Sequence, residues 1–229
     1  MGGQACILYG AAEFSRDTDF AILHSEENLE KLKGALGQLE AEQVFLPPLD
    51  VKFLKKGHAC HFRCRHPDAL GFRIDVMSVL RGCDPFDRLW SRRTVIDLPG
   101  LPGVPLLSLP DLVLAKKTQR DKDWPMIRRL VERDYERHRA SPTEEKLRFW
   151  IRESRTPAHL FEIARAAPVL VDQELESRPS LRLLKTGDPE SVENALFEEQ
   201  ARERALDREY WKPLRAELEA MRHSRGSSF

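Results

Sequence analysis

The chain changes character near residue 105, and this change limits the folds that are open to it. From Met1 to about Val104, strand-like stretches alternate with helical ones, whereas the rest of the sequence is almost entirely helical in pattern. Mixed elements followed by a run of helices are typical of an α+β core joined to a helical region. We therefore expect an α+β fold, with a small mixed sheet over residues 1–108 and a helical C-terminal domain over residues 109–229.

The expected elements follow from hydrophobic periodicity and from turn residues. Strands are predicted at residues 17–23, 51–54, 58–65 and 71–80, and helices at residues 4–9 and 26–42. In the second half, Ser141 is the predicted cap of a helix whose first residue is Pro142. Asp188 and Pro189 open a last long helix that reaches about Arg222.

Composition excludes several classes of protein. With 41% hydrophobic and 32% charged residues, the chain can bury a core, which excludes collagen and wholesale disorder. No apolar run approaches the ~18–20 residues of a membrane helix. Lys and Arg total 37, as do Asp and Glu, which argues against a global basic field for nucleic acid. The four cysteines are too scattered for a disulfide scaffold, so we expect a cytoplasmic protein without a membrane partner.

Three acidic residues carry the most chemical information. Asp17 and Asp19 lie two apart in a strand-like run, so both side chains leave the same face. Asp75 lies between apolar neighbours in another predicted strand, and a neighbouring strand could bring it beside them. Three such carboxylates could hold two Mg²⁺ ions ~3.5–4 Å apart, the apparatus of phosphoryl or nucleotidyl transfer. The second Asp-x-Asp, at Asp121 and Asp123, lies in a charged helical stretch and is interpreted as solvated surface.

The motif Gly2-Gly3, then Ser15-x-Asp17-x-Asp19, then Asp75 resembles the signature of the DNA polymerase beta-type nucleotidyltransferase superfamily. It is similar to the bacterial branch that contains abortive-infection and toxin–antitoxin nucleotidyltransferases. The resemblance covers roughly residues 1–123 and departs in one respect, because the family's glycine pair ends a strand and only Met1 precedes it here. We therefore expect the core without its first strand.

The resemblance implies a role for each residue of the motif. Gly2 and Gly3 would let backbone amides approach the triphosphate, and Ser15 belongs to the same nucleotide-binding motif. The three acids would be catalytic and would bind Mg²⁺ or Mn²⁺.

Lys116 is the predicted basic residue of the site. With Leu109, Leu112, Val113 and Arg120 it shares one stripe of a predicted helix, at 100° per residue. A lysine in an apolar stripe needs a buried anion or a route to water, and both readings stay open. The resemblance favours contact with the nucleotide phosphates.

Three other patterns have less specific interpretations. Cys60 and Cys64 would lie ~13 Å apart in a strand, too far to share a zinc ion, so we interpret them as small apolar core residues. The mixed charges of residues 128–139 favour a solvated helical face, with an RNA contact as the alternative. The apolar stripe of residues 198–222 is expected to pack on the helical domain or on a second subunit, as in a homodimer.

Two functional hypotheses result. The first is a Mg²⁺-dependent nucleotidyltransferase that transfers a nucleoside monophosphate from an NTP to an RNA, protein or small-molecule hydroxyl, as a toxin–antitoxin or phage-defence component. The second is a catalytically inactive nucleotide- or RNA-binding module that retains the fold.

Overall fold

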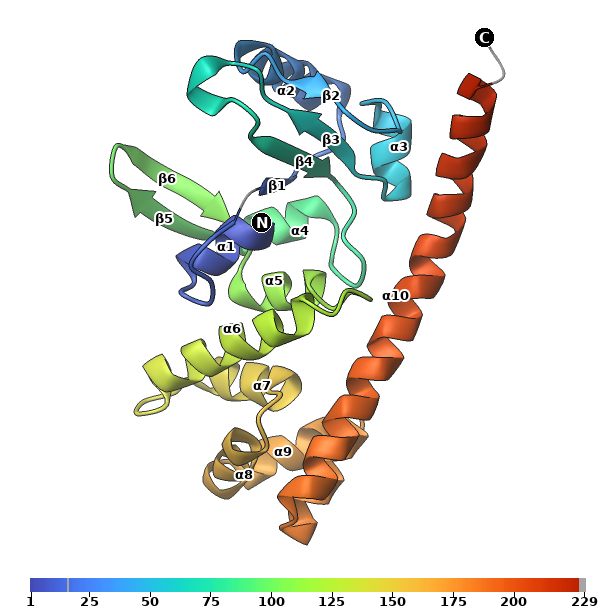
Figure 1. Ribbon diagram of the computed structural model, residues 1–229. Coiled ribbons are helices and arrows are strands. Elements are labelled where there is room, and N and C mark those ends of the chain that lie inside the picture. The colour runs from blue at the N-terminus through green and yellow to red at the C-terminus, as the bar shows by residue number, and fades with distance from the viewer. Residues whose placement is uncertain (16, 227–229) are drawn as a thin grey trace. The chain divides into compact units, whose positions relative to one another are not determined.

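The structure is a computed structural model that describes residues 1–15 and 17–226 (Figure 1). It divides into two compact units. The first comprises residues 1–115 together with the chain from Asp207 onward, and the second is Lys116–Leu206. The sequence had suggested a boundary after residue 108 and one helical domain beyond it. The first unit instead extends through a further helix and includes the last part of the chain.

The first unit is α+β and contains a four-stranded sheet and a two-stranded one. Its elements are α1 (Gly2–Leu8), β1 (Asp17–Ala21), α2 (Glu26–Gln38), β2 (Glu42–Gln43), α3 (Val51–Lys56), β3 (Cys60–Arg63), η1 (Pro67–Ala69), β4 (Arg73–Met77), α4 (Phe86–Ser91), β5 (Thr94–Leu98), β6 (Leu101–Leu106) and α5 (Leu109–Ala115). The second unit is helical. Its elements are α6 (Asp123–His138), α7 (Glu144–Glu153), α8 (Pro157–Ala166), α9 (Pro168–Glu174), η2 (Pro179–Thr186) and the first part of α10 (Pro189–Gly226).

The main sheet is small and mixed, as expected. Its strand order is β1-β4-β3-β2, with β1 parallel to β4 and the other neighbours antiparallel. One face is apolar and packs on α2 and α3. The buried cluster there comprises Leu29, Leu36, Leu54, Cys60, Phe62, Cys64, Ile74 and Val76. The strand residues in this cluster are even-numbered. Because side chains alternate along a strand, the odd-numbered residues of β1, β3 and β4 lie on the opposite face of the sheet.

The expected strand at residues 51–54 is wrong, because this segment is helix α3. The Asp50 carboxylate accepts a hydrogen bond from the Lys52 amide, and Gly57 ends the helix at φ 99° in the left-handed region. A short apolar run fits a strand or a buried helix equally well. The cap before it and the glycine after it are the signals that distinguish the two.

One further expectation needs correction. The helix predicted to start at Pro142 begins at Glu144, with Thr143 as its cap, since the Thr143 side chain accepts from the Lys146 amide. β6 contains two prolines, which have no backbone N–H to donate. A two-stranded ribbon tolerates them because each strand has a free edge where no donor is needed.

The expected packing of residues 198–222 on the helical domain holds only up to Leu206, because α10 from Asp207 onward belongs to the unit of the α+β core. Asp207 is buried and pairs with Arg81 at 3.0 Å. Glu217 pairs with His58 at 2.9 Å and with Lys56. A Cβ built on Gly57 would lie 2.3 Å from the Tyr210 hydroxyl oxygen. Of the apolar stripe, Leu214 is buried within the chain whereas Leu206 is exposed, and the homodimer stays a prediction.

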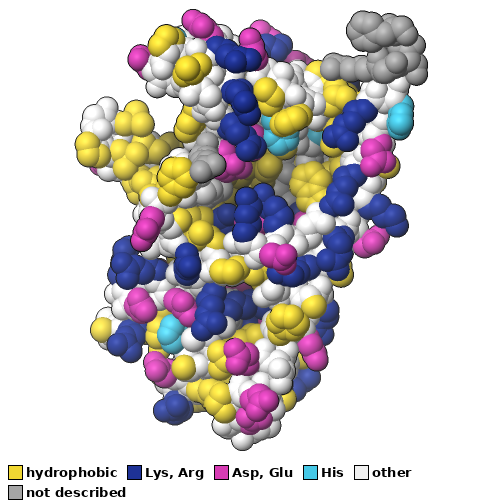
Figure 2. All heavy atoms as spheres, in the orientation of Figure 1, with side chains coloured by type: hydrophobic (Ala, Val, Ile, Leu, Met, Phe, Trp, Pro, Cys, Tyr) yellow, Lys and Arg dark blue, Asp and Glu magenta, His cyan; other side chains and the backbone are white. Residues whose placement is uncertain are grey.

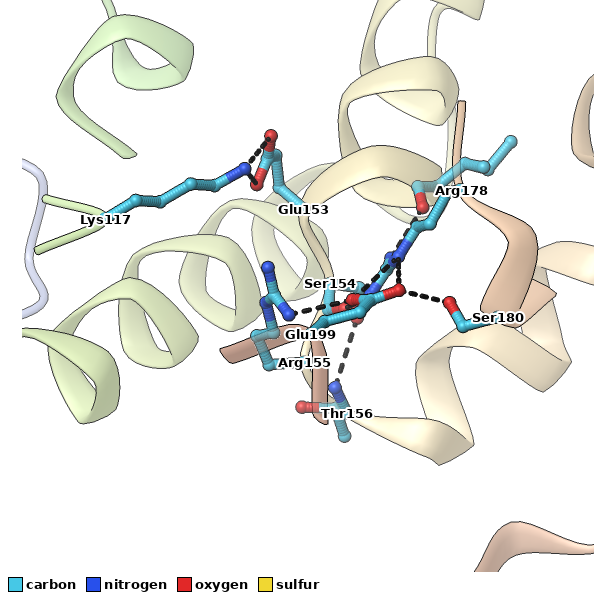
Figure 3. Close-up of polar contacts among 9 residues, drawn as sticks. Lys117, Glu153, Ser154, Arg155, Thr156, Arg178, Ser180 and Glu199 are labelled. Carbon is cyan, nitrogen blue, oxygen red and sulfur yellow. Dashed lines mark hydrogen bonds and ion pairs between the residues drawn. The ribbon is translucent and has the colours of Figure 1, made fainter. Parts of the chain in front are cut away.

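A buried network of ion pairs ties the helical unit together (Figure 3). Arg178 donates to the backbone carbonyls of Ile151 and Ser154, at 2.7 and 2.9 Å, and to the Glu199 carboxylate. Arg155 also donates to Glu199, at 2.9 Å. These contacts join the end of α7, the start of η2 and α10, because one carboxylate compensates two buried guanidinium groups.

Surface charge is distributed in small patches. Lys and Arg side chains are interspersed with Asp and Glu over the visible face in Figure 2. Among the described residues, none of the helices has the length and apolar character needed to cross a membrane.

Candidate functional site

The polar face of the main sheet brings the predicted acids together. In the parallel pair of β1 and β4, Asp19 lies opposite Asp75, and Asp17 lies opposite Arg73. In the antiparallel pair of β4 and β3, Asp75 lies opposite His61. Residues opposite each other on neighbouring strands project from the same face. Two adjacent rows result, one of Asp17 and Arg73 and one of Asp19, Asp75 and His61.

The glycine pair lies against the acids of β1. A Cβ built on Gly2, which has φ 69°, would lie 1.7 Å from Oδ2 of Asp19. A Cβ built on Gly3 would lie 2.3 Å from the Ser15 hydroxyl oxygen. The Met1 amino group donates to the Asp19 backbone carbonyl at 2.7 Å. Only glycine allows the start of α1 to come this close to β1.

Ser15 orients the first carboxylate of the motif. Its hydroxyl lies 2.9 Å from the Asp17 carbonyl oxygen and 3.1 Å from Asp17 Oδ1. The hydroxyl hydrogen can be donated to either oxygen, so both contacts restrain the start of β1. Gly3, Ser15 and Asp17 therefore lie together in one local arrangement, and their role in nucleotide binding stays a prediction.

Two residues at this face were not predicted. His61 Nδ1 lies 2.8 Å from Asp75 Oδ1, and the exposed ring of Phe45 packs edge-on against the imidazole. Arg73 extends its guanidinium to 3.6 Å from Asp75 Oδ2 and 4.0 Å from Asp17 Oδ2. Arg73 stands two residues before Asp75, so strand alternation places the two on one face. That signal was present in the sequence, whereas the position of His61 depends on the strand order.

The donor chemistry of this face suits a hard divalent cation, since its carboxylates are oxygen ligands. Among the described residues, however, no group of three His, Cys, Asp or Glu side chains is arranged to hold a metal ion. Instead, the charged partner that the structure gives Asp17 and Asp75 is Arg73. The positive charge of Arg73 compensates these two carboxylates in part.

Lys116 has an aspartate partner, but one outside the predicted acid triad. Its Nζ lies 3.5 Å from Asp123 Oδ1, inside the helical unit. Asp123 also accepts from Thr118 and Arg120. Burial by itself would raise the pKa of Asp123, but the charge of Lys116 and these contacts outweigh it and lower that pKa. Asp123 is buried and not solvated surface as expected, and contact of Lys116 with phosphate stays a prediction.

The cysteines belong to the core. Cys60 and Cys64 are fully buried beside Phe62 and Val76, as expected for small apolar residues. Burial raises the pKa of the Cys60 thiol to about 11 and raises that of Cys64. Neither thiol is therefore prepared to act as a thiolate nucleophile near neutral pH.

Comparison of the chain with protein-family models, with curated proteins and with solved structures gave no match. The resemblance to the nucleotidyltransferase superfamily therefore stays a prediction from the sequence motif.

Proposed function

We propose that this chain is a divalent-metal-dependent nucleotidyltransferase of the polymerase beta type. The observation that supports this most directly is the register of Asp19 with Asp75, with the backbone of Gly2 against the Asp19 carboxylate. Paired acids on adjacent strands next to a glycine-lined helix start can serve both a cation and a phosphate chain.

Each residue has a distinct task in this proposal. Asp17, Asp19 and Asp75 would hold Mg²⁺ or Mn²⁺, which supplies charge neutralisation at the phosphates when bound. Gly2 and Gly3 admit the triphosphate to the backbone, and Ser15 keeps Asp17 in place. The Asp75 carboxylate, held by His61, faces the acceptor and takes its hydroxyl proton.

The reaction balances as a simple displacement. The acceptor oxygen forms a bond to the α-phosphorus, the bond from that phosphorus to the bridging oxygen breaks, and pyrophosphate leaves with the electron pair. The acceptor is a hydroxyl of RNA, protein or a small molecule. We propose that the reaction takes place in the cytoplasm, and the toxin–antitoxin or phage-defence setting stays a prediction from the resemblance.

Thermal unfolding with Mg²⁺ and each NTP tests nucleotide binding. A ligand that binds only the folded state at 100 times its Kd stabilises it by about 2.7 kcal/mol. Asp19→Asn and Asp75→Asn should lose the Mg²⁺-dependent part of this shift. Asp68→Asn is the matched control, because its side chain is 93% exposed and lies in η1. Equal shifts in all variants would show that the acids are structural.

The second candidate is an inactive nucleotide-binding module, which the position of Arg73 between two acids favours. Incubation with α-labelled NTPs and tRNA, protein or small hydroxyl acceptors separates the two candidates. Label transfer that Asp19→Asn abolishes supports the enzyme. Acid-dependent NTP binding with no transfer to any of these acceptors supports the module.

A further inference from the structure

We propose that a cavity in the helical unit binds a free straight-chain monocarboxylate, with its alkyl chain in the cavity and its carboxylate at Arg165. The cavity lies between α8, α9, η2 and the start of α10 and has a volume of about 560 Å³. A cavity of this size suits one small organic ligand. All the residues that line it belong to the helical unit, so the proposal does not depend on the proposed function.

The first argument is the apolar lining. Val171 and Leu181 are buried at the cavity, and Phe161 and Leu184 are half-buried there. Ala164 contributes a small side chain, which leaves room beside α8. The free energy gained by removing apolar surface from water is roughly proportional to the area covered. A ligand for this cavity therefore has a sizeable apolar part, and an alkyl chain provides it.

The second argument is the charge at the cavity. Its charged residues are Arg165, Asp172 and Lys185, and all three are exposed. Lys185 Nζ pairs with Asp172 Oδ1 at 3.2 Å. These two charges compensate each other, so the positive charge of Arg165 remains. The net positive charge favours an anionic head group over a neutral or cationic one.

The third argument is the availability of the Arg165 guanidinium. Among the described residues, none forms a hydrogen bond or an ion pair with this side chain. The acid of the same helix, Glu162, accepts from the Tyr135 hydroxyl at 2.5 Å instead. The guanidinium can therefore donate two parallel hydrogen bonds to a ligand, and a carboxylate is an anion that fits this fork.

Calorimetric titration of the full chain with octanoate, decanoate and dodecanoate, each below its micelle concentration, tests the proposal. Each CH₂ group that leaves water should strengthen binding about fourfold, so decanoate should bind roughly 15-fold more tightly than octanoate. Decanol has the same chain without the charge and should bind more weakly than decanoate. Absence of decanoate binding, or equal affinities for octanoate and decanoate, would overturn the proposal.

Arg165→Gln tests the head group. It should weaken decanoate binding about two- to fivefold and leave decanol binding unchanged, because only decanoate carries the charge. Arg182→Gln is the matched control, since Arg182 is an exposed arginine of η2 outside the cavity lining. Equal losses in both variants would indicate a general electrostatic field. That result, or unchanged decanoate affinity in Arg165→Gln, would also overturn the proposal.

Ala164→Leu tests the place of the alkyl chain. The added side chain occupies the cavity, so decanoate and decanol should both bind about tenfold more weakly or worse. Ala158→Leu makes the same change at an exposed position of α8 outside the cavity lining and should bind like wild type. Thermal unfolding of Ala164→Leu should occur at or above the wild-type temperature, because the side chain fills a cavity. Wild-type affinity in Ala164→Leu would place the ligand elsewhere and refute the proposal.

Discussion

The Asp19 carboxylate occupies the space that a side chain at residue 2 would need, since a Cβ on Gly2 would lie 1.7 Å from Asp19 Oδ2. The start of α1 and the middle of β1 are therefore fitted to each other. The packing of α1 against β1 depends on this close approach of Gly2 to Asp19. The site can accordingly be tested from the glycine side as well as from the acids.

Gly2→Ala should displace Asp19 and abolish the Mg²⁺-dependent stabilisation by NTP. The substitution also places a side chain at φ 69°, which costs about 1 kcal/mol for a non-glycine residue. Gly34→Ala is the control, because no atom lies within 4 Å of its added Cβ and it lies inside α2. That variant should bind normally and gain about 0.5–1 kcal/mol of stability. Normal NTP binding by Gly2→Ala would contradict the assignment of the glycine.

Glu199→Gln should destabilise the helical unit by about 3 kcal/mol, because it leaves two buried guanidinium groups without their anion. Burial by itself would raise the pKa of Glu199, but hydrogen bonds and charge from Arg178 outweigh it and lower that pKa. Urea unfolding measures the difference. Glu198→Gln changes the exposed neighbour and should stay within about 0.5 kcal/mol of wild type. Equal stabilities would mean that water compensates the guanidinium groups.

Lys116→Met should lower the free energy of unfolding by about 1–3 kcal/mol, because the buried Asp123 loses one cation and keeps Thr118 and Arg120. Lys122→Met, at an exposed position beside Asp123, is the control and should have little effect. Thermal unfolding and NTP titration of the same samples separate two roles for Lys116. If Lys116→Met binds NTP more weakly but is as stable as wild type, the predicted contact of Lys116 with phosphate is supported.

Docking of the last part of α10 should be sensitive to acid. Hydrogen bonds from His58 and then Lys56 lower the pKa of Glu217 from its ordinary 4.5. A carboxyl group with a lowered pKa stabilises the fold above its unfolded pKa, and this contribution is lost as pH falls through the folded pKa. The stability difference between wild type and Glu217→Gln should therefore be largest near neutral pH and vanish well below pH 4.5.

Unfolding followed from neutral pH downward checks this, with Glu219→Gln as the control at an exposed position of the same helix. A difference between wild type and Glu217→Gln that does not change with pH would contradict the role assigned to the carboxylate.

The sequence determined the features that depend on local geometry. Strand alternation placed Asp17 and Asp19 on one face, and a glycine pair marked the helix start that approaches them. The change of pattern near residue 105 indicated a mixed sheet followed by helices. A short apolar run was ambiguous, however, and residues 51–54 were assigned to a strand although Asp50 and Gly57 delimit a helix.

Tertiary structure alone decided which residues became partners. No local sequence pattern predicts that β4 lies beside β1. Only the strand order brings Asp75 next to Asp19 and His61 next to Asp75. In the same way, Lys116 meets Asp123, and the last part of α10 packs on the sheet domain. Hydrophobic periodicity shows which face of an element is buried but not against what. That choice depends on the packing of the whole chain, because burial of apolar surface is non-directional.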